Sequence, residues 1–178
     1  MGIVGAAFAI IIVKCFFGGL GHNFVNPALA ARAFLLSCYP VAMTTWTNPL
    51  KGNLFGTAAV SSATPLVAEK GVYSYLDLFL GSCPGCIGEI SAAALLIGLV
   101  YLLYRKVITW HIPVIYIGTV FVLSYVLGQD GAYQILSGGL MLGAIFMATD
   151  YTTSPMTVKG QIVYALLLGV LTVVIRTF

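Results

Sequence analysis

The sequence is short of charged residues. Only 7% of its 178 residues are Asp, Glu, Lys or Arg, whereas 60% are hydrophobic. Soluble globular domains carry about 25% charged residues, which cover their water-exposed surface. This composition therefore excludes an ordinary soluble domain and indicates an integral membrane protein embedded in a lipid bilayer. The net charge of +3 comes from scattered Lys and Arg residues, which we interpret as topology signals, so no nucleic-acid partner is expected.

Cysteine is also scarce, with Cys15, Cys38, Cys83 and Cys86 as the whole set, too few for a disulfide-rich scaffold. Cys83-Pro-Gly-Cys86 has the CxxC spacing of redox disulfides and of half a zinc site. Zinc would need a second pair of ligands, for which His111 alone is a poor candidate, and a thioredoxin-like site would need a βαβ setting that the sequence lacks. We therefore expect no metal, and we interpret the pair as small residues in a glycine-rich turn.

The sequence has no basic segment before its first apolar run, so no cleavable signal peptide is expected. That run, Ile3 to Phe17, is shorter than the roughly 20 residues of a complete membrane span. The chain also stops at Phe178 without a polar tail. We expect residues 1–178 to form a single transmembrane domain that is an incomplete part of a longer chain.

The apolar runs have the length of helices, which predicts an all-α polytopic membrane protein. Membrane spans are expected over four ranges: Ile87–Tyr104, Ile108–Leu127, Ala132–Ala148 and Gly160–Phe178. In the third range, Gly139 and Gly143 have the spacing that permits close helix packing. Shorter helices are expected over Ala28–Tyr39 and Val72–Leu80, and a long loop is expected over Val41–Lys70.

Two polar interruptions resemble each other. Gly21–Pro27 and Asp150–Pro155 each follow an apolar segment and place amides or hydroxyls before a proline that would start a new helix. Paired interruptions are typical of inverted repeats whose broken half-helices meet near the membrane midplane. On this interpretation one central site is lined by four side chains: Asn23, Asn26, Thr153 and Ser154. The alternative is two unrelated helices that each begin at a proline.

Arg32 lies inside the short helix expected after Pro27. An arginine at membrane depth is costly and commonly marks a functional site. The alternative is a structural arginine that snorkels or pairs with backbone carbonyl groups.

A hydroxyl-rich turn interrupts the long loop. Ser61, Ser62 and Thr64 place three hydroxyls within four residues, just before Pro65. The simpler interpretation is a turn that opens a helix, with Thr64 as its N-cap and Pro65 at the first helical position. The alternative is an attachment point for a phosphate-bearing group.

With these features placed, the sequence resembles the D subunit of the Rnf ferredoxin:NAD+ oxidoreductase, a family homologous to the B subunit of the Na+-translocating NADH:quinone oxidoreductase. The similar stretches run in order through nearly the whole chain: Gly18–Phe34, Met43–Trp46, Ser61–Pro65, Ile87–Glu89, Gly128–Asp130, Ser137–Gly139 and Met147–Thr157. A single S-x-A-T motif carries little information, but the ordered set is specific.

The resemblance implies an electron-transfer subunit of an ion-translocating oxidoreductase, not catalytic alone, with FMN joined by a phosphoester bond to Thr64. Riboflavin is a further candidate cofactor. The residues expected near the flavin are Thr64, Ser61, Ser62, Ala63, Asn23, Asn26, Arg32, Thr153, Ser154 and Thr157. Ser62 stands where the family commonly has Gly or Thr, and the cysteine pair replaces the usual small residues. The implied fold is an inverted-repeat bundle that resembles ammonium and urea channels.

The implied partners are the other Rnf subunits (A, B, C, E and G) and Na+ or H+ as coupling ion. Three alternatives remain: the quinone reductase B subunit, a urea- or ammonium-type channel without flavin, and a structural subunit of a membrane complex. The positive-inside rule places Arg105 and Lys106 in the cytoplasm, which leaves the Thr64 loop on the outer side of the inner or plasma membrane.

Overall fold

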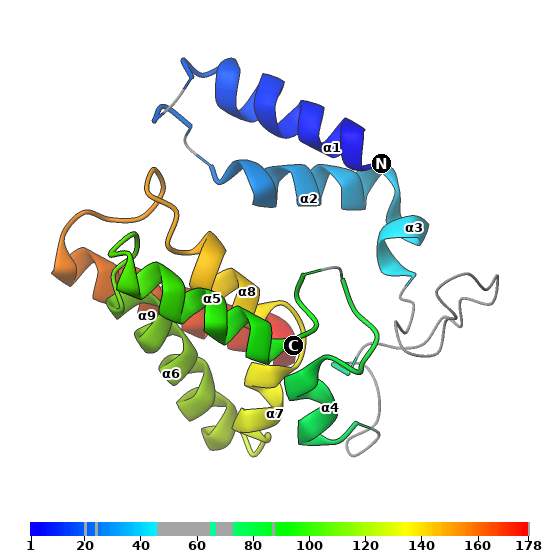
Figure 1. Ribbon diagram of the computed structural model, residues 1–178, viewed down its shortest axis with the longest axis vertical. Coiled ribbons are helices and arrows are strands. Elements are labelled where there is room, and N and C mark those ends of the chain that lie inside the picture. Colours follow the sequence, from blue (N-terminus) through cyan, green and yellow to red (C-terminus); the bar gives the residue numbers. More distant parts are fainter. Residues whose placement is uncertain (20, 24, 46–64, 67–72, 87, 178) are drawn as a thin grey trace.

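The computed structural model describes residues 1–178 except 20, 24, 46–64, 67–72, 87 and 178. The described residues form helices and no strands (Figure 1). The prediction of an all-α protein is therefore confirmed for this part of the chain. A helical hairpin at the N-terminus lies over a bundle formed by the second half of the sequence.

The N-terminal hairpin consists of two antiparallel segments. Helix α1 (Gly2–Ala7) continues directly into the π-helical turns of η1 (Phe8–Cys15), and α2 (Pro27–Cys38) returns beside them. The rings of Phe8 and Phe34 stack with centroids 4.1 Å apart, which joins the two segments. The expected loop that follows begins instead with a short helix, α3 (Pro40–Thr44), because Pro40 suits a first helical position.

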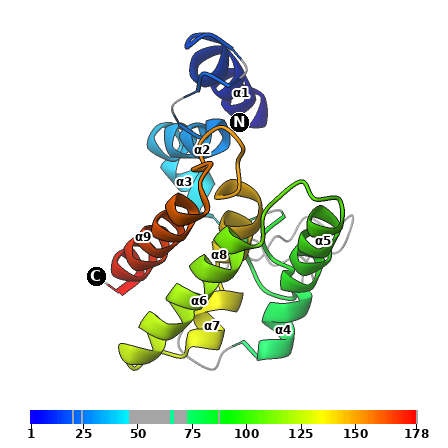
Figure 2. The same ribbon diagram turned by 90° about the vertical axis from the view of Figure 1, so that its left-hand side faces the viewer.

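The centre of the bundle is the pair α6 (His111–Val126) and α9 (Val158–Thr177), which pack along each other. The start of α9 meets the residues just before α6, where Thr109 donates a hydrogen bond to Gln161 at 3.3 Å, and further along both helices Thr119 lies against Gly169. The pair is therefore parallel, with both helices beginning at the same end of the molecule (Figure 2). Their buried core includes Ile112, Tyr116, Val120, Ala165 and Val173.

The expected span Ala132–Ala148 is wrong, because the structure divides it into three pieces: α7 (Gly131–Leu136), α8 (Leu140–Leu142) and η2 (Gly143–Met147). The interruption falls at Ser137–Gly139, where Gly138 has a φ of +67° that side chains rarely adopt. Of the two glycines expected to permit close packing, only Gly139 is closely approached, by the Glu89 side chain, because a Cβ on Gly143 would have no neighbour within 4 Å.

The expected span Ile87–Tyr104 is shorter than predicted. Helix α5 (Ala92–Tyr104) begins only after Ser91, whose hydroxyl accepts a hydrogen bond from Ala94 N at 3.3 Å. Gly88 has a φ of +90°, so helical geometry cannot extend back through it. Before this loop, α4 (Tyr75–Leu80) begins with a capping box between Ser74 and Asp77 and packs against α5 and α7.

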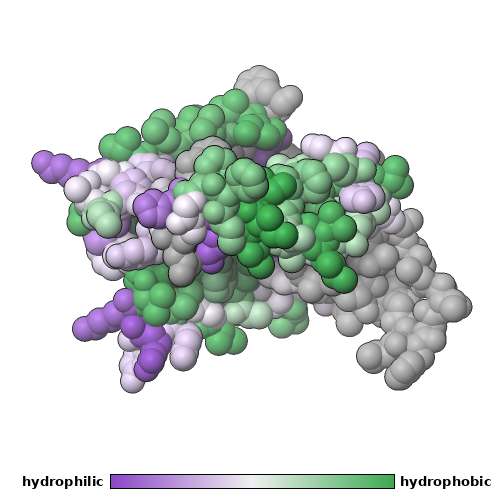
Figure 3. All heavy atoms as spheres, turned by 90° about the horizontal axis from the view of Figure 1, so that it is seen from above, coloured by the Kyte–Doolittle hydropathy of each residue, from purple (hydrophilic) through white to green (hydrophobic). Residues whose placement is uncertain are grey.

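One helix in the described part of the chain, α9, is long and apolar enough to cross a membrane by length and composition. Four shorter helical segments are also apolar: Gly2–Cys15, Pro27–Cys38, Ala92–Tyr104 and His111–Val126. Their outward faces carry large apolar side chains, such as Ile3, which is 87% exposed, and Val126, which is 73% exposed. Figure 3 shows this hydrophobic surface over the middle of one face, with hydrophilic groups projecting at its left edge.

Candidate functional site

The first polar interruption builds a firm helix start. Asn26 caps α2, since its side-chain oxygen accepts hydrogen bonds from the backbone N–H groups of Ala28 at 3.0 Å and Leu29 at 3.3 Å. Pro27 occupies the first helical position, where its missing N–H costs nothing. The predicted cap and the predicted short helix are both confirmed.

The structure places the two interruptions side by side. The buried side-chain amide of Asn23 donates to the Thr152 hydroxyl at 3.0 Å, and that of Asn26 donates to the carbonyl of Met147 at 3.3 Å. Asn26 and Thr153 also line one cavity of about 370 Å³ between α2, α6 and α9. Asn26 and Thr153 thus share one cavity, whereas Asn23 reaches the adjacent Thr152.

Ser154 and Thr157 lie elsewhere. Ser154 and Pro155 line a different cleft, next to Thr109 at the start of α6. The hydroxyl of Thr157 accepts a hydrogen bond from Gly160 N at 3.2 Å, which caps α9. The expectation that Pro155 starts the new helix is wrong, because α9 begins at Val158 and Thr157 supplies its cap.

Arg32 contacts a loop of the bundle rather than the meeting point of the two interruptions. Its guanidinium lies 3.6 Å from the Glu89 carboxylate and 3.8 Å from the Cys86 sulfur. The Glu89 side chain is 9% exposed and the Arg32 side chain 44% exposed. The other Glu89 oxygen accepts a hydrogen bond from Cys86 N at 3.4 Å. The Glu89 carboxylate also fills the space beside Gly139, where a Cβ would lie 2.6 Å from it.

The interruption at Ser137–Gly139 is bound by Arg176, a residue for which the sequence analysis predicted no role. Arg176, near the end of α9, donates to the backbone carbonyls of Gln134 at 2.7 Å and Ser137 at 3.3 Å. The Ser137 hydroxyl is buried without a hydrogen-bond partner in the described structure. The paired glycines 138 and 139 were the signal for this break, but the apolar run around them favoured a continuous helix.

The hydroxyl turn reaches the same region through its last residues. The carbonyl of Pro65 accepts a hydrogen bond from the Tyr133 hydroxyl at 2.9 Å. The Leu66 side chain packs on Gly138, where a Cβ would lie 2.6 Å from it. The expected flavin attachment residue Thr64, with Ser61, Ser62 and Ala63, lies outside the described residues.

Both cysteines of the CxxC sequence are free thiols in the loop between α4 and α5, with Cys83 buried and Cys86 half-buried. Burial, followed by the negative charge of Glu89, raises the pKa of the Cys86 thiol, which Arg32 offsets in part. The residues that the structure describes include no group of three or more His, Cys, Asp or Glu side chains placed to hold a metal ion.

Comparison with known proteins decides the family. The model of the NQR2, RnfD, RnfE family matches residues 1–178. The chain belongs to this family. The resemblance drawn from the ordered motifs is confirmed, and it identifies a membrane-associated family.

Curated relatives carry two kinds of names. The chain is 52% identical to the D subunit of the Na+-translocating ferredoxin:NAD+ oxidoreductase complex of Acetobacterium woodii, over 100% of this chain and 57% of that protein. It is 44% identical to the D subunit of the proton-translocating complex of Clostridium ljungdahlii, over 97% of this chain and 57% of that protein. Identity to the B subunit of the Na+-translocating NADH-quinone reductase of Klebsiella pneumoniae is 38%, over 97% of this chain and 47% of the relative. The chain thus spans about half the length of these relatives.

Proposed function

We propose that the chain forms part of the membrane electron-transfer D subunit of an ion-translocating ferredoxin:NAD+ oxidoreductase. The observation that carries this proposal is the family match over all 178 residues, with 52% identity to such a subunit. The subunit would work as one component of a multi-subunit translocase, with the other Rnf subunits as partners and Na+ or H+ as the transported ion. It would not be catalytic alone.

Covalent FMN at Thr64 is the cofactor that we propose. FMN accepts and passes electrons, whereas the protein supplies attachment, orientation and electrostatics. Two buried oxygens without hydrogen-bond partners in the described structure, of Ser137 and Glu89, lie at the break on which Leu66 packs. These groups fit the polar edge of a flavin, which offers both hydrogen-bond donors and acceptors.

Each of the described residues would have a distinct role toward the flavin. Tyr133 would hold the backbone that follows Thr64, through its hydrogen bond to Pro65. Arg32 would favour a reduced, anionic flavin, because 44% of its side chain stays exposed beside the Glu89 pair. Riboflavin is a second candidate cofactor.

We also propose that this region is one transmembrane domain with an inverted repeat of broken half-helices, as in ammonium and urea channels. The hydrogen bonds from Asn23 to Thr152 and from Asn26 to Met147 support it, because they join the two interruptions across 129 and 121 residues of sequence. Such a meeting of interrupted helices is typical of repeat-built membrane proteins.

The positive-inside rule supports a topology with Arg105 and Lys106 in the cytoplasm and the Thr64 loop on the outer side. A cysteine introduced at Asn53 should therefore react with a membrane-impermeant thiol reagent in intact cells. Labelling that requires an opened membrane would reverse this topology.

The B subunit of a Na+-translocating NADH:quinone reductase is the second candidate, favoured by 38% identity to one such protein. Both candidates would carry the flavin, so they are separated by the subunits that copurify and by the electron donor, reduced ferredoxin or NADH. A urea- or ammonium-type channel would lack the flavin altogether.

The decisive experiment is mass spectrometry of the peptide that contains Thr64, from the full-length subunit. We expect the mass of FMN on that peptide, and a fluorescent band after denaturing electrophoresis. Thr64→Ala should abolish both signals, whereas Ser62→Ala, the matched hydroxyl control, should retain them. Thr64→Ser keeps an acceptor hydroxyl and should retain part of the label. Fluorescence that survives Thr64→Ala would refute the assignment.

A further inference from the structure

A cleft opens where helices α6 and α9 both begin. It has a volume of about 330 Å³. Its walls combine polar and apolar side chains: Val107, Thr109, Ile112, Ser154, Met156 and Gln161. Small-molecule sites commonly have volumes of about 300–1,000 Å³. The cleft is therefore large enough to hold a small polar group.

Hydrogen bonds fix the polar wall of this cleft. Gln161 accepts from the Thr109 hydroxyl at 3.3 Å and donates to the carbonyl of Pro155 at 3.1 Å. These bonds join the start of α6, the start of α9 and the loop before α9. The Ser154 side chain lines the same cleft and makes no side-chain hydrogen bond within the described structure, so its hydroxyl is available to a ligand.

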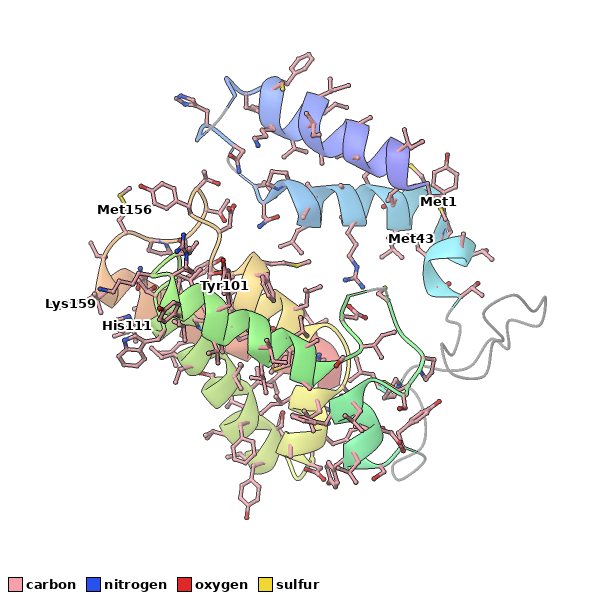
Figure 4. The ribbon with its side chains drawn as sticks, viewed as in Figure 1. Met1, Met43, Tyr101, His111, Met156 and Lys159 are labelled. Atoms are coloured by element: carbon pink, nitrogen blue, oxygen red, sulfur yellow. The ribbon has the colours of Figure 1, made fainter. Side chains whose placement is uncertain are left out.

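Three cationic residues lie close in sequence to residues that line the cleft. Arg105 and Lys106 are exposed in the turn that directly precedes the lining residue Val107, and Lys159 is exposed two residues before Gln161. Figure 4 shows Lys159 and His111 at the same end of the molecule. None of these three cations forms an ion pair with another described residue. The nearby Asp150 carboxylate instead accepts hydrogen bonds from Thr152 and Thr153.

Three exposed aromatic residues lie close in sequence to these cations. Tyr104 is 81% exposed, Trp110 is 57% exposed and Tyr151 is 82% exposed. Trp and Tyr are enriched at the level of the lipid headgroups, because their amphipathic rings contact both hydrocarbon and water there. Together with the cations, they place the mouth of the cleft at the membrane–water boundary.

An apolar groove begins three residues further along α6. It lies between the same two helices and is lined by Ile115, Thr119, Val122, Leu166 and Val170. A ligand long enough to occupy both the cleft and the groove would meet polar groups at the helix starts and hydrocarbon side chains further along α6 and α9. This order matches the headgroup and acyl chains of a phospholipid.

We propose that the cleft binds the headgroup phosphate of an anionic phospholipid, with an acyl chain in the groove between α6 and α9. Arg105, Lys106 and Lys159 attract the negative charge, Ser154 supplies a hydroxyl toward the phosphate, and Thr109 holds Gln161 in the wall of the cleft. Basic pockets between transmembrane helices are known to select anionic lipids by this combination of charge and depth. The site is separate from the proposed flavin region around Arg32 and Glu89, so either assignment can fail alone.

The test is native mass spectrometry of the purified intact complex containing the full-length subunit, reconstituted in nanodiscs with equal phosphatidylglycerol and phosphatidylcholine. We expect phosphatidylglycerol to be retained preferentially. The double variant Arg105→Gln/Lys159→Gln should weaken its retention by about five-fold for each charge removed. Lys14→Gln, which removes a charge on η1, is the matched control and should retain the lipid as the unmodified protein does.

Two further arms separate the alternatives. Thr109→Val and Ser154→Ala keep the charge but remove hydroxyls, so a loss in these variants supports a built headgroup site rather than a general surface potential. Inorganic phosphate should not displace the lipid at millimolar concentration. Equal retention of both lipids, unchanged retention in the double variant, or displacement by inorganic phosphate would each overturn the proposal. Unchanged elution volume and helical circular dichroism show that the variants remain folded.

Discussion

Gly139 is the position where one methyl group tests the contact between Glu89 and the interrupted helix. A Cβ built there lies 2.6 Å from the Glu89 carboxylate and 3.9 Å from the Arg32 guanidinium. Ordinary contact begins at 3.4 Å, so the carboxylate must retreat by about 0.8 Å. Gly139 has a φ of −78°, which alanine adopts without strain. Gly139→Ala therefore perturbs packing and not the backbone.

The expected loss of stability follows from these distances. Crowding a packed site by one methyl group costs about 1–3 kcal/mol. The Arg32–Glu89 pair is 3.6 Å long and 44% of the Arg32 side chain is exposed, so solvent screens it. Lengthening such an ion pair therefore adds less than about 1 kcal/mol to the loss of stability. Steric displacement therefore dominates, and Tm should fall by roughly 2–4 °C for each kcal/mol lost.

The assay is thermal unfolding of the full-length subunit in detergent, followed by circular dichroism. Gly143→Ala is the matched control, because a Cβ at Gly143 meets nothing within 4 Å. It should leave stability unchanged or raise it by about 0.5–1 kcal/mol. In a Glu89→Ala background the penalty of Gly139→Ala should disappear, because the obstructing carboxylate is gone. Equal effects of the two glycine substitutions would refute the contact.

Asn26→Ala should destabilise the protein by about 1 kcal/mol through the lost cap of α2, and Asn26→Asp, which keeps the cap oxygen, should recover most of this loss in thermal unfolding. Burial raises the pKa of the Cys83 thiol above the ordinary 9.0. At pH 8, iodoacetamide should therefore alkylate Cys83 more slowly than the exposed Cys15. The alkylation rate of Cys83 should keep rising beyond pH 9, because more of its thiol then becomes thiolate. Equal rates at pH 8, measured by peptide mass spectrometry, would contradict its burial.

Local sequence signals predicted those elements whose ends depend on neighbouring residues. The Asn26-Pro27 pair specifies the start of α2 because the cap oxygen and the proline act within one helical turn. The expected span Ile108–Leu127 corresponds to α6, and the final apolar run corresponds to α9, within a few residues. Continuous hydrophobicity identified these two helices correctly.

Continuous hydrophobicity failed to predict helix breaks at which side chains distant in the sequence bind the freed backbone groups. Hydrophobicity is continuous from Ala132 to Ala148, yet the helix breaks at Ser137–Gly139 because Arg176 binds the freed carbonyls from 39 and 42 residues away. The expected helix from Ile87 fails for a related reason, since Glu89 turns back to Cys86 N and toward Arg32. A window of local sequence does not contain these partners.

The candidate site could also be predicted only in part. Polar residues before each proline indicated that the interruptions belong together, but the direct hydrogen bond joins Asn23 to Thr152, whereas Ser154 faces another cleft.

The charges of the described arginines bear on the proposed flavin region. Arg32 forms an ion pair with Glu89 but stays 44% exposed, while Arg176 reaches the adjacent break through carbonyl groups that carry no net charge. Among the residues that the structure describes there, one positive charge therefore remains in excess beside Leu66, which favours an anionic group in the region that we propose for the flavin.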